Sequence, residues 1–304
     1  VKKAGIPPEC LPQRESPPRA SDVAPVGPVV AHLDRVLRRG QRLGVLAAGL
    51  AFGHAVRVVA HLAVLVFHLD QTRLGLEAGV QVFTEKPVVV SIDETLELAR
   101  LLAKHGGAAR AMVGLVLRYS QHMVDLRAAL SQGWLGEITS LEANEHIGPY
   151  HGAFFMRDWR RKTGLAGGFM LEKCCHDLDI YNMVTGSRPA RVASFGGRKS
   201  FVPANAPRSN AEADIFHIKK SVWESTDDPF NSDGDIIDYQ TAILQYETGA
   251  SLAFHTNLNV PDEHRRFCVM GTHGMAEGDF VRGFLKVTAR DGSRLADHDY
   301  TQGT

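Results

Sequence analysis

Three polar residues that can exchange protons or bind cations share one face of a predicted helix. Glu172, His176 and Asp179 are spaced four and three residues apart, and side chains at this spacing are neighbours on an α-helix. An imidazole with an unperturbed pKa near ~6.5 can exchange a proton with a bound molecule around neutral pH. The stripe therefore indicates a site for proton transfer, and the competing interpretation is a helix surface whose carboxylates simply hold the histidine.

A lysine stands directly after a short apolar strand. Glu85-Lys86-Pro87 follows residues 80–84, and proline cannot continue a central strand. Open α/β folds bind their ligands at the carboxyl ends of the strands, so an ammonium at Lys86 could hold a hydroxyl group or transfer its proton. A solvated surface lysine is the alternative. The two observations predict a catalytic cleft only if Lys86 and His176 face each other across it.

A metal site and a cysteine nucleophile are further interpretations of the same segment. A histidine with two carboxylates could ligate a hard or borderline cation, but the sequence contains no H-E-x-x-H motif and no C-x-x-C pair. Cys174 and Cys175 lie among leucines, which is typical of core packing. We predict no metal site, and a metal-dependent hydrolase that uses His176 and Asp179 is the weakest alternative.

Two kinds of chain organisation surround these residues. The first part alternates strand and helix, as in an α/β domain: strand 80–84, a helix from the Ser91 and Glu94 capping box to Gly106, strand 112–117, and a helix that ends at Gly133. The second part predicts an α+β domain: one helix over 168–184, strands 190–196, 236–246, 250–258, 266–270 and 284–289, a hairpin turn at 247–249, and a lid-like loop over 201–235.

Length and composition limit the classes of protein. A chain of 304 residues is long enough for two domains. Its 34 basic and 34 acidic residues cancel, which disfavours nucleic acid and membrane surfaces as partners. Four cysteines without a pairing pattern fit a reduced, cytoplasmic protein. Seven of the 14 prolines fall in the first 28 residues and predict a disordered leader over 1–28, and the apolar run 43–69 is interrupted by Arg57 and too short on either side to span a membrane.

Four motifs occur in order along residues 82–272: V-F-T-E-K-P at 82–87, G-L-V-L-R-Y at 114–119, G-G-F-M-L-E-K-C-C-H-D-L-D at 167–179, and P-D-E-H-R-R-F at 261–267 with Gly271-Thr272. Together they resemble the Gfo/Idh/MocA family, which includes glucose-fructose oxidoreductase and inositol dehydrogenase. The resemblance implies a Rossmann-like nucleotide-binding domain over 29–118. It also implies a C-terminal α+β domain over 119–304, with a large, mostly antiparallel open sheet for substrate binding and oligomerisation.

The same resemblance implies an activity and roles for individual residues. The expected activity is NAD- or NADP-dependent transfer of a hydride between nicotinamide and a sugar, cyclitol or related polyol, in a homodimer or homotetramer formed through the sheet. Lys86 and His176 match the family's catalytic lysine and histidine, and Glu172 takes the place of an aspartate. The expected binding residues are Glu85, Lys86, Pro87 and Arg118 for the cofactor, and Tyr119, Trp159, Arg160 and Asp179 for the substrate.

The sequence lacks the usual glycine motif of the turn that would hold the cofactor's pyrophosphate. No G-x-G occurs in the chain, and Gly49 and Gly53 are the nearest candidates at a different spacing. We therefore expect residues 1–73 to be a divergent or truncated nucleotide-binding region. The alternative function is a non-catalytic relative that acts as a ligand-binding or oligomerising module.

Overall fold

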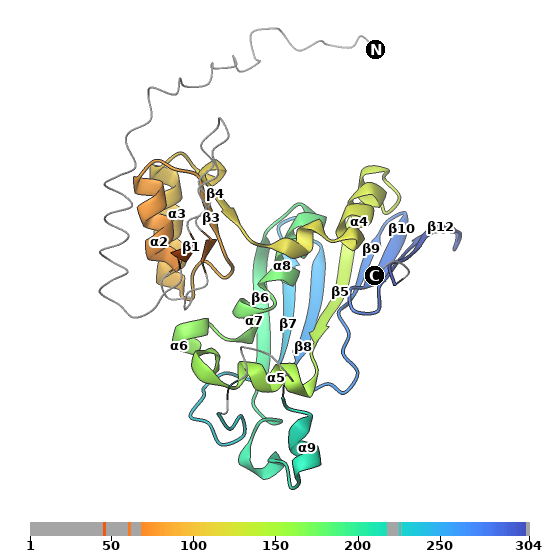
Figure 1. Ribbon diagram of the computed structural model, residues 1–304. Helices are drawn as coiled ribbons and strands as arrows, with labels where there is room; N and C mark the ends of the chain where they lie inside the picture. Colours follow the sequence, from red (N-terminus) through yellow and green to blue (C-terminus); the bar gives the residue numbers. More distant parts are fainter. Residues whose placement is uncertain (1–44, 47–59, 62–67, 218–224, 226, 302–304) are drawn as a thin grey trace, which may run out of the picture. The chain divides into compact units, whose positions relative to one another are not determined.

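The computed structural model describes residues 45–46, 60–61, 68–217, 225 and 227–301. The predicted leader over 1–28 and the candidate turn glycines Gly49 and Gly53 lie outside these residues. Figure 1 shows the described elements, coloured from orange in the first α/β part to dark blue at the last strand.

The first part contains a βαβ unit. Its parallel strands β3 and β4 pair with Val82 opposite Ala111 and Thr84 opposite Val113, and a helix connects them, as a parallel pair requires. This is the unit from which a Rossmann fold is built. The elements are β1 (Val45–Leu46) antiparallel to β2 (Ala60–His61), α2 (His68–Glu77), β3 (Val82–Thr84), α3 (Ile92–Lys104), η4 (Ala108–Arg110) and β4 (Ala111–Val113).

The predicted capping box at the start of α3 is confirmed. The Ser91 side chain accepts a hydrogen bond from the Glu94 N–H, and the Glu94 carboxylate accepts one from the Val90 N–H at 2.7 Å. Leu101 of α3 packs with Leu76 and Val82 in a small core of its own. The apolar face of α3 therefore fixes the strand after which Lys86 stands.

The predicted strand over 112–117 is wrong in its second half. The Gly114 N–H still donates to the Thr84 carbonyl, but the Leu115 N–H turns back to the Val113 carbonyl at 2.7 Å. The chain then forms the 3₁₀ turn η5 (Val116–Tyr119) and helix α4 (Gln121–Ser131). A run of apolar residues cannot distinguish a strand that continues from one that ends in such a turn.

Within the described residues, eight strands form one large sheet in the order β12-β11-β10-β9-β5-β8-β7-β6, with β6 and β12 at its two edges (Figure 1). Among them β5 and β8 are parallel, and the other neighbouring pairs are antiparallel. The strands are β5 (Ile138–His146), β6 (Pro189–Gly197), β7 (Tyr239–Tyr246), β8 (Ser251–Asn257), β9 (Arg266–Gly271), β10 (Gly274–Asp279), β11 (Phe284–Ala289) and β12 (Arg294–Asp299).

The five strands predicted for this domain are present, and β5, β10 and β12 were not predicted. Each of these three carries the residues that strand propensity disfavours: β5 reads ITSLEANEH, β10 reads GMAEGD and β12 reads RLADHD. Burial of one face of the sheet outweighs these weak local preferences.

Helices cover one face of the sheet. Helix α8 (Cys175–Thr185) packs Tyr181 against Phe254 of β8, with ring centroids 6.4 Å apart, and α4 contacts β11. On the opposite face Phe195 and Ile243 are exposed. The alternation of buried and more exposed residues along β7 and β8 thus separates a helix-covered core from an outer face that carries these two apolar side chains.

The segment before α8 departs from the predicted single helix over 168–184. The elements are α5 (Pro149–Phe155), η6 (Asp158–Arg161), α6 (Thr163–Ala166) and α7 (Phe169–Glu172), followed by α8. The Cys174 N–H reaches back to the Phe169 carbonyl, and the N–H groups of Asp177 and Leu178 both donate to the Cys174 carbonyl. The helical ladder is therefore interrupted at Lys173–Cys174, although the apolar periodicity runs through the break.

The stretch predicted as a lid-like loop contains structure where it is described. It includes η7 (Pro203–Asn205) and α9 (Asn210–Asp214). Phe201, Phe216 and Phe230 pack together with ring centroids 4.9–6.0 Å apart. The polar composition predicted a loop because the three aromatic residues are widely separated in the sequence.

Candidate functional site

Lys86 stands at the carboxyl end of β3. The neighbouring Pro87 carbonyl accepts a hydrogen bond from Nδ1 of His68 on α2 at 2.9 Å, and His68 is buried. Burial lowers the pKa of His68, so its ring stays neutral at pH 7 and donates to this carbonyl. This contact ties the turn after β3 to α2, and no motif in the sequence indicated it.

The Lys86 side chain contacts the end of α7. Its Nζ donates to the Glu172 carbonyl at 2.6 Å and lies 3.9 Å from Oε1 of the same residue. In a continuous helix this carbonyl would accept a bond from the His176 N–H, but α7 ends at Glu172, and the carbonyl accepts the bond from Lys86. The break that the sequence did not predict is thus what brings two predicted residues together.

The Glu172 carboxyl group is buried beside positive charges. Burial raises its pKa, and the charges of Lys86, Arg160 and Lys173 partly oppose that rise. Its Oε2 is buried without a hydrogen-bond partner among the described residues. A buried acceptor without a partner costs free energy, which makes this oxygen a candidate to bind a ligand.

His176 lies within the electrostatic reach of the same lysine. Burial lowers its pKa to about 4, and the charges of Lys86, Arg265 and Lys173 contribute in the same direction. The ring is therefore neutral at pH 7, in contrast to the near-neutral pKa expected for an unperturbed imidazole. Its Nδ1 is buried and has no partner among the described residues.

Arg160 is the fourth member of this group, which we call the Lys86 cluster (Lys86, Glu172, His176 and Arg160). The guanidinium carbon of Arg160 lies 4.0 Å from the ring centroid of Phe154 and 4.4 Å from that of Trp159. Its Nε is buried without a partner within the described part of the chain. Three members of the cluster therefore each carry an unpartnered polar atom.

The predicted polar stripe is divided in the structure. Glu172 is on α7 beside Lys86. Asp179 lies on α8, about one helical turn after His176, and accepts two hydrogen bonds from Arg118. The Asp179 contact raises the pKa of Arg118. Tyr119 is exposed. The binding roles predicted for Arg118, Tyr119 and Asp179 stay predictions.

A second charged group, which sequence reasoning missed, lies next to the Lys86 cluster. We call it the Arg265 cluster (Arg265, Asp177, Glu145 and Lys173). Arg265 donates to both carboxylate oxygens of Asp177 at 2.8 and 2.6 Å and lies 2.9 Å from Glu145, which in turn lies 3.5 Å from Lys173. Burial raises the pKa of Glu145 to about 7 against the pull of Arg265 and Lys173.

One half of the Arg265 cluster had a signal in the sequence. Asp177 follows the predicted histidine, and Arg265 lies in the P-D-E-H-R-R-F motif, so a pair between the two motifs could have been considered. Glu145 had none, because its strand β5 was not predicted. It takes a core position in the alternation of Leu141, Ala143 and Glu145.

The described residues fit a nicotinamide cofactor and a polar substrate better than a metal. No group of three His, Cys, Asp or Glu residues converges as metal ligands in the described part of the chain. By contrast, β3 and β4 end together at Glu85, Lys86 and Gly114, where a Cβ on Gly114 would lie 3.0 Å from the Glu85 carboxylate. The unpartnered atoms of Glu172 and His176 lie beyond this edge, where a dinucleotide fold presents its ligand.

Two family models match the chain. Residues 123–277 match the GFO/IDH/MocA C-terminal domain, and residues 54–114 match the oxidoreductase family with an NAD-binding Rossmann fold. The chain belongs to the Gfo/Idh/MocA family. The family confirms the predicted Rossmann-like domain and the α+β domain with its large, mostly antiparallel sheet.

Curated relatives extend beyond the length of this chain. YteT of Bacillus subtilis (strain 168), which is named only provisionally as an oxidoreductase, is 25% identical over 270 residues, covering 75% of this chain and 63% of YteT. The D-xylose dehydrogenase of Paenarthrobacter nicotinovorans is 25% identical over 221 residues, covering 70% of this chain and 50% of the dehydrogenase. The chain therefore spans less than two thirds of these relatives.

Solved structures share the fold. A levoglucosan dehydrogenase in complex with NADH and levoglucosan has a TM-score of 0.63 at 16% identity, covering 80% of this chain and 60% of the dehydrogenase. An oxidoreductase domain protein from Kribbella flavida has a TM-score of 0.62 at 18% identity, with the same two coverages. Among the described residues of this chain, no helix is long and apolar enough to cross a membrane.

Proposed function

We propose that this protein is an NAD(P)-dependent oxidoreductase that interconverts an alcohol and a carbonyl group on a sugar, cyclitol or related polyol. The contact of Lys86 with Glu172, with His176 within electrostatic reach, is the observation that carries the proposal. Lys86 follows β3, whereas Glu172 and His176 lie on α7 and α8, far away in the sequence. Glu172 and His176 each carry an unpartnered polar atom that a hydroxylated ligand could satisfy. Membership of an oxidoreductase family supports the same chemistry.

The reaction divides between cofactor and protein. Oxidation of an alcohol removes a hydride from carbon and a proton from oxygen as the C=O bond forms, and a bound nicotinamide supplies the acceptor for the hydride. The chain has to bind the hydroxyl group, orient it and take its proton. Glu85, Lys86 and Pro87, at the end of β3, would hold the nicotinamide end of the cofactor.

Lys86 is the proposed partner for the hydroxyl proton. The Glu172 carbonyl lies 2.6 Å from its Nζ and fixes the direction of the side chain. As a neutral amine Lys86 would take the hydroxyl proton during oxidation, and as the resulting ammonium it would return the proton during reduction. His176 has a pKa of about 4, so at pH 7 its neutral ring can donate or accept one hydrogen bond from the same hydroxyl. Lys86 thus moves the proton, and His176 orients the oxygen that carries it.

The substrate class rests on the relatives and on the polar lining. The relatives and structural neighbours include dehydrogenases named for D-xylose and levoglucosan, which are both carbohydrates. Trp159 and Arg160 in η6 are proposed to line the substrate side of the site, and stacking of sugar rings on an aromatic face is common in such sites. We also propose that the exposed Phe195 and Ile243 on the outer sheet face become buried in a homodimer or homotetramer.

Cofactor binding is the first test. Titration with NADH and with NADPH, followed by nicotinamide fluorescence, should show saturable binding at micromolar concentrations of at least one of them. A panel of aldoses, cyclitols and sugar acids is then screened for reduction of NAD⁺ or NADP⁺. Failure of both nucleotides to bind would overturn the proposal and favour the non-catalytic module.

A further inference from the structure

Arg160 differs from the other basic residues around Lys86 in having no acidic partner. The others are paired: Lys86 with Glu172, Arg118 with Asp179, Arg265 with Asp177 and Glu145, and Lys173 with Glu145. Among the described residues, none forms a hydrogen bond or an ion pair with the Arg160 guanidinium. The contacts that it has are with the rings of Phe154 and Trp159.

This environment buries the Nε of Arg160 without pairing it, while the residue as a whole is half-buried. Burial lowers the pKa of Arg160, and the distances to the two rings are those of cation–π contacts. Ring faces attract a cation but accept no full set of N–H hydrogen bonds, and guanidinium has five N–H donors. An arginine held this way is prepared for a ligand that supplies acceptor oxygens.

Arg160 is directed at the proposed active site. Its charge acts on the buried Glu172 carboxyl group, which also lies 3.9 Å from Lys86. Arg160 and Glu172 nevertheless do not pair. Glu172 Oε2 and Arg160 Nε are both buried without a hydrogen-bond partner within the described residues. The two groups therefore do not satisfy each other, and a ligand next to Lys86 would meet both.

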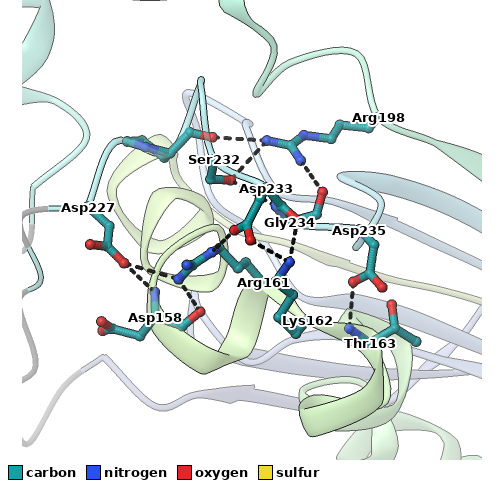
Figure 2. Close-up of polar contacts among 11 residues, drawn as sticks. Asp158, Arg161, Lys162, Thr163, Arg198, Asp227, Ser232, Asp233, Gly234 and Asp235 are labelled. Carbon is teal, nitrogen blue, oxygen red and sulfur yellow. Dashed lines mark hydrogen bonds and ion pairs between the residues drawn. The ribbon is translucent and has the colours of Figure 1, made fainter.

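A network of ionic contacts fixes the turn that carries Arg160 (Figure 2). Arg161 lies 3.0 Å from Asp227 and 2.8 Å from Asp233, and Lys162 lies 2.8 Å from Asp233. The Thr163 N–H donates to Asp235 at 2.6 Å. The carboxylates of Asp227, Asp233 and Asp235 are thus engaged by the neighbours of Arg160.

The backbone of the same turn is held as well. Asp158, which precedes Trp159, has a φ of +50°, in the left-handed region that costs free energy for a residue other than glycine. Its N–H donates to Asp227 at 3.2 Å. Contacts from residues about 70 positions later in the chain therefore hold a strained turn, and with it the position of Arg160.

The site as a whole has a positive character. Burial lowers the pKa of His151 to about 3, and the positive charges of Lys173, Arg265 and Lys86 contribute in the same direction. The same three charges also lower the pKa of His176. Burial also favours the neutral acid at Glu172 and Glu145. These surroundings favour a ligand that brings a negative charge.

We propose that Arg160 binds an oxyanion group of the substrate, so that the enzyme acts on an acidic carbohydrate, carrying a carboxylate or a phosphate ester, in preference to a neutral one. The inference rests on the proposed function for the choice of a carbohydrate. The planar fork of a guanidinium matches two oxygens of a carboxylate or a phosphate, which a sugar hydroxyl cannot provide. The acidic group would lie at Arg160 and the reacting hydroxyl at Lys86.

Matched ligand pairs test the inference by direct binding. Calorimetric titration of the full chain compares D-glucose with D-glucuronate, D-galactose with D-galacturonate, and D-glucose with D-glucose 6-phosphate. We expect at least one acidic sugar to bind ~10-fold or more tightly than its neutral counterpart, because the charged hydrogen bonds are added only in the acid. The uronates and the phosphate ester distinguish a carboxylate from a phosphate. Equal or weaker binding of every acidic sugar would overturn the inference.

Variants assign the preference to Arg160. Arg160→Gln should bring the ratio of acid to neutral affinity close to one, whatever it does to the affinity for the neutral sugar. Arg160→Lys should keep part of the preference because the charge remains without the fork. Arg188→Gln is the control, since the Arg188 side chain is 83% exposed. A preference that survives in Arg160→Gln, or an equal loss of both sugars, would contradict the assignment.

The outcomes separate this inference from the proposed function. If NADH binds and neutral sugars are oxidised as well as acidic ones, the oxidoreductase stands and the role of Arg160 falls. If acidic sugars bind through Arg160 but neither NADH nor NADPH binds, the subsite stands and the oxidoreductase falls.

Discussion

The Lys86 cluster and the Arg265 cluster each take two side chains from the same segment, and these residues are directly adjacent in the sequence. Glu172 and His176 belong to the first, and their neighbours Lys173 and Asp177 belong to the second. Both groups are charged and largely buried. In the Arg265 cluster each charge meets an opposite one at hydrogen-bonding or ion-pair distance, whereas the Lys86 cluster contains three unpartnered polar atoms.

This difference indicates separate tasks for the two clusters. A satisfied buried network fixes the packing of the chain, and an unsatisfied one is prepared for a ligand. Adjacent side chains on a helix point in different directions, so a shift of one residue is enough to move from one task to the other.

The largest expected effect is the loss of stability when the Arg265 cluster is broken. Arg265→Met leaves the Asp177 carboxylate, which is 0% exposed, without its bidentate partner. Removing one member of a buried ion pair costs about 3–5 kcal/mol, and urea unfolding followed by circular dichroism measures it. Arg266→Met is the control, because the Arg266 side chain is 49% exposed and pairs with Glu277 at the surface. Equal effects of the two variants would mean that the buried network contributes little.

A smaller effect on stability is expected in the Lys86 cluster. Glu172→Gln keeps the backbone carbonyl that holds Lys86 and replaces a carboxyl group whose Oε2 has no partner. We expect the free energy of unfolding to stay within about 1 kcal/mol, since the side chain loses only its 3.9 Å ion pair with Lys86 and no hydrogen bond. Turnover should fall by ~10-fold because an amide next to Lys86 cannot exchange a proton. A loss of stability as large as that of Arg265→Met would place Glu172 among the packing residues.

The smallest effects are opposite changes with pH. His176 has its pKa lowered to about 4, so the unfolded chain takes up this proton at a higher pH than the folded one. Its contribution to stability is therefore lost as pH falls from about 6.5 towards 4. Glu145 has its pKa raised to about 7, so it contributes stability that grows as pH falls from 7 towards 4.5.

Urea unfolding at pH 7 and at pH 5 resolves these two contributions. Acidification should destabilise His176→Asn less than the parent protein, and it should destabilise Glu145→Gln more than the parent. Changes of the same sign in both variants would contradict the contrast between the clusters.

The sequence predicted individual elements well where local signals were strong. The capping box of Ser91 and Glu94 requires nothing beyond its own residues, and the hairpin turn at 247–249 forms with the Gly249 N–H donating to the Tyr246 carbonyl at 2.9 Å. Family membership and the two-domain type of fold followed from motifs spread over residues 82–272. Such signals are local, so they persist whatever the rest of the chain does.

Long-range satisfaction of polar groups could not be predicted in this way. The break at Lys173–Cys174, the Arg265 cluster and the ionic contacts of Arg161 all depend on partners many residues away. The expected proximity of Lys86 to Glu172 came from the family resemblance, but the backbone carbonyl that mediates it had no signature in the side-chain pattern. The periodicity of apolar residues indicates which face of a helix is buried, but it does not indicate which backbone carbonyl groups lack a partner within the helix.

The most direct test of the account is the initial rate of nicotinamide reduction by Lys86→Met, measured with a sugar that the parent protein oxidises. Lys104→Met, at the exposed end of α3, is the matched control. We predict a rate ~100-fold or more below that of the parent for Lys86→Met at saturating cofactor, because the partner for the hydroxyl proton is lost. A rate equal to that of Lys104→Met would show that Lys86 takes no part in the chemistry.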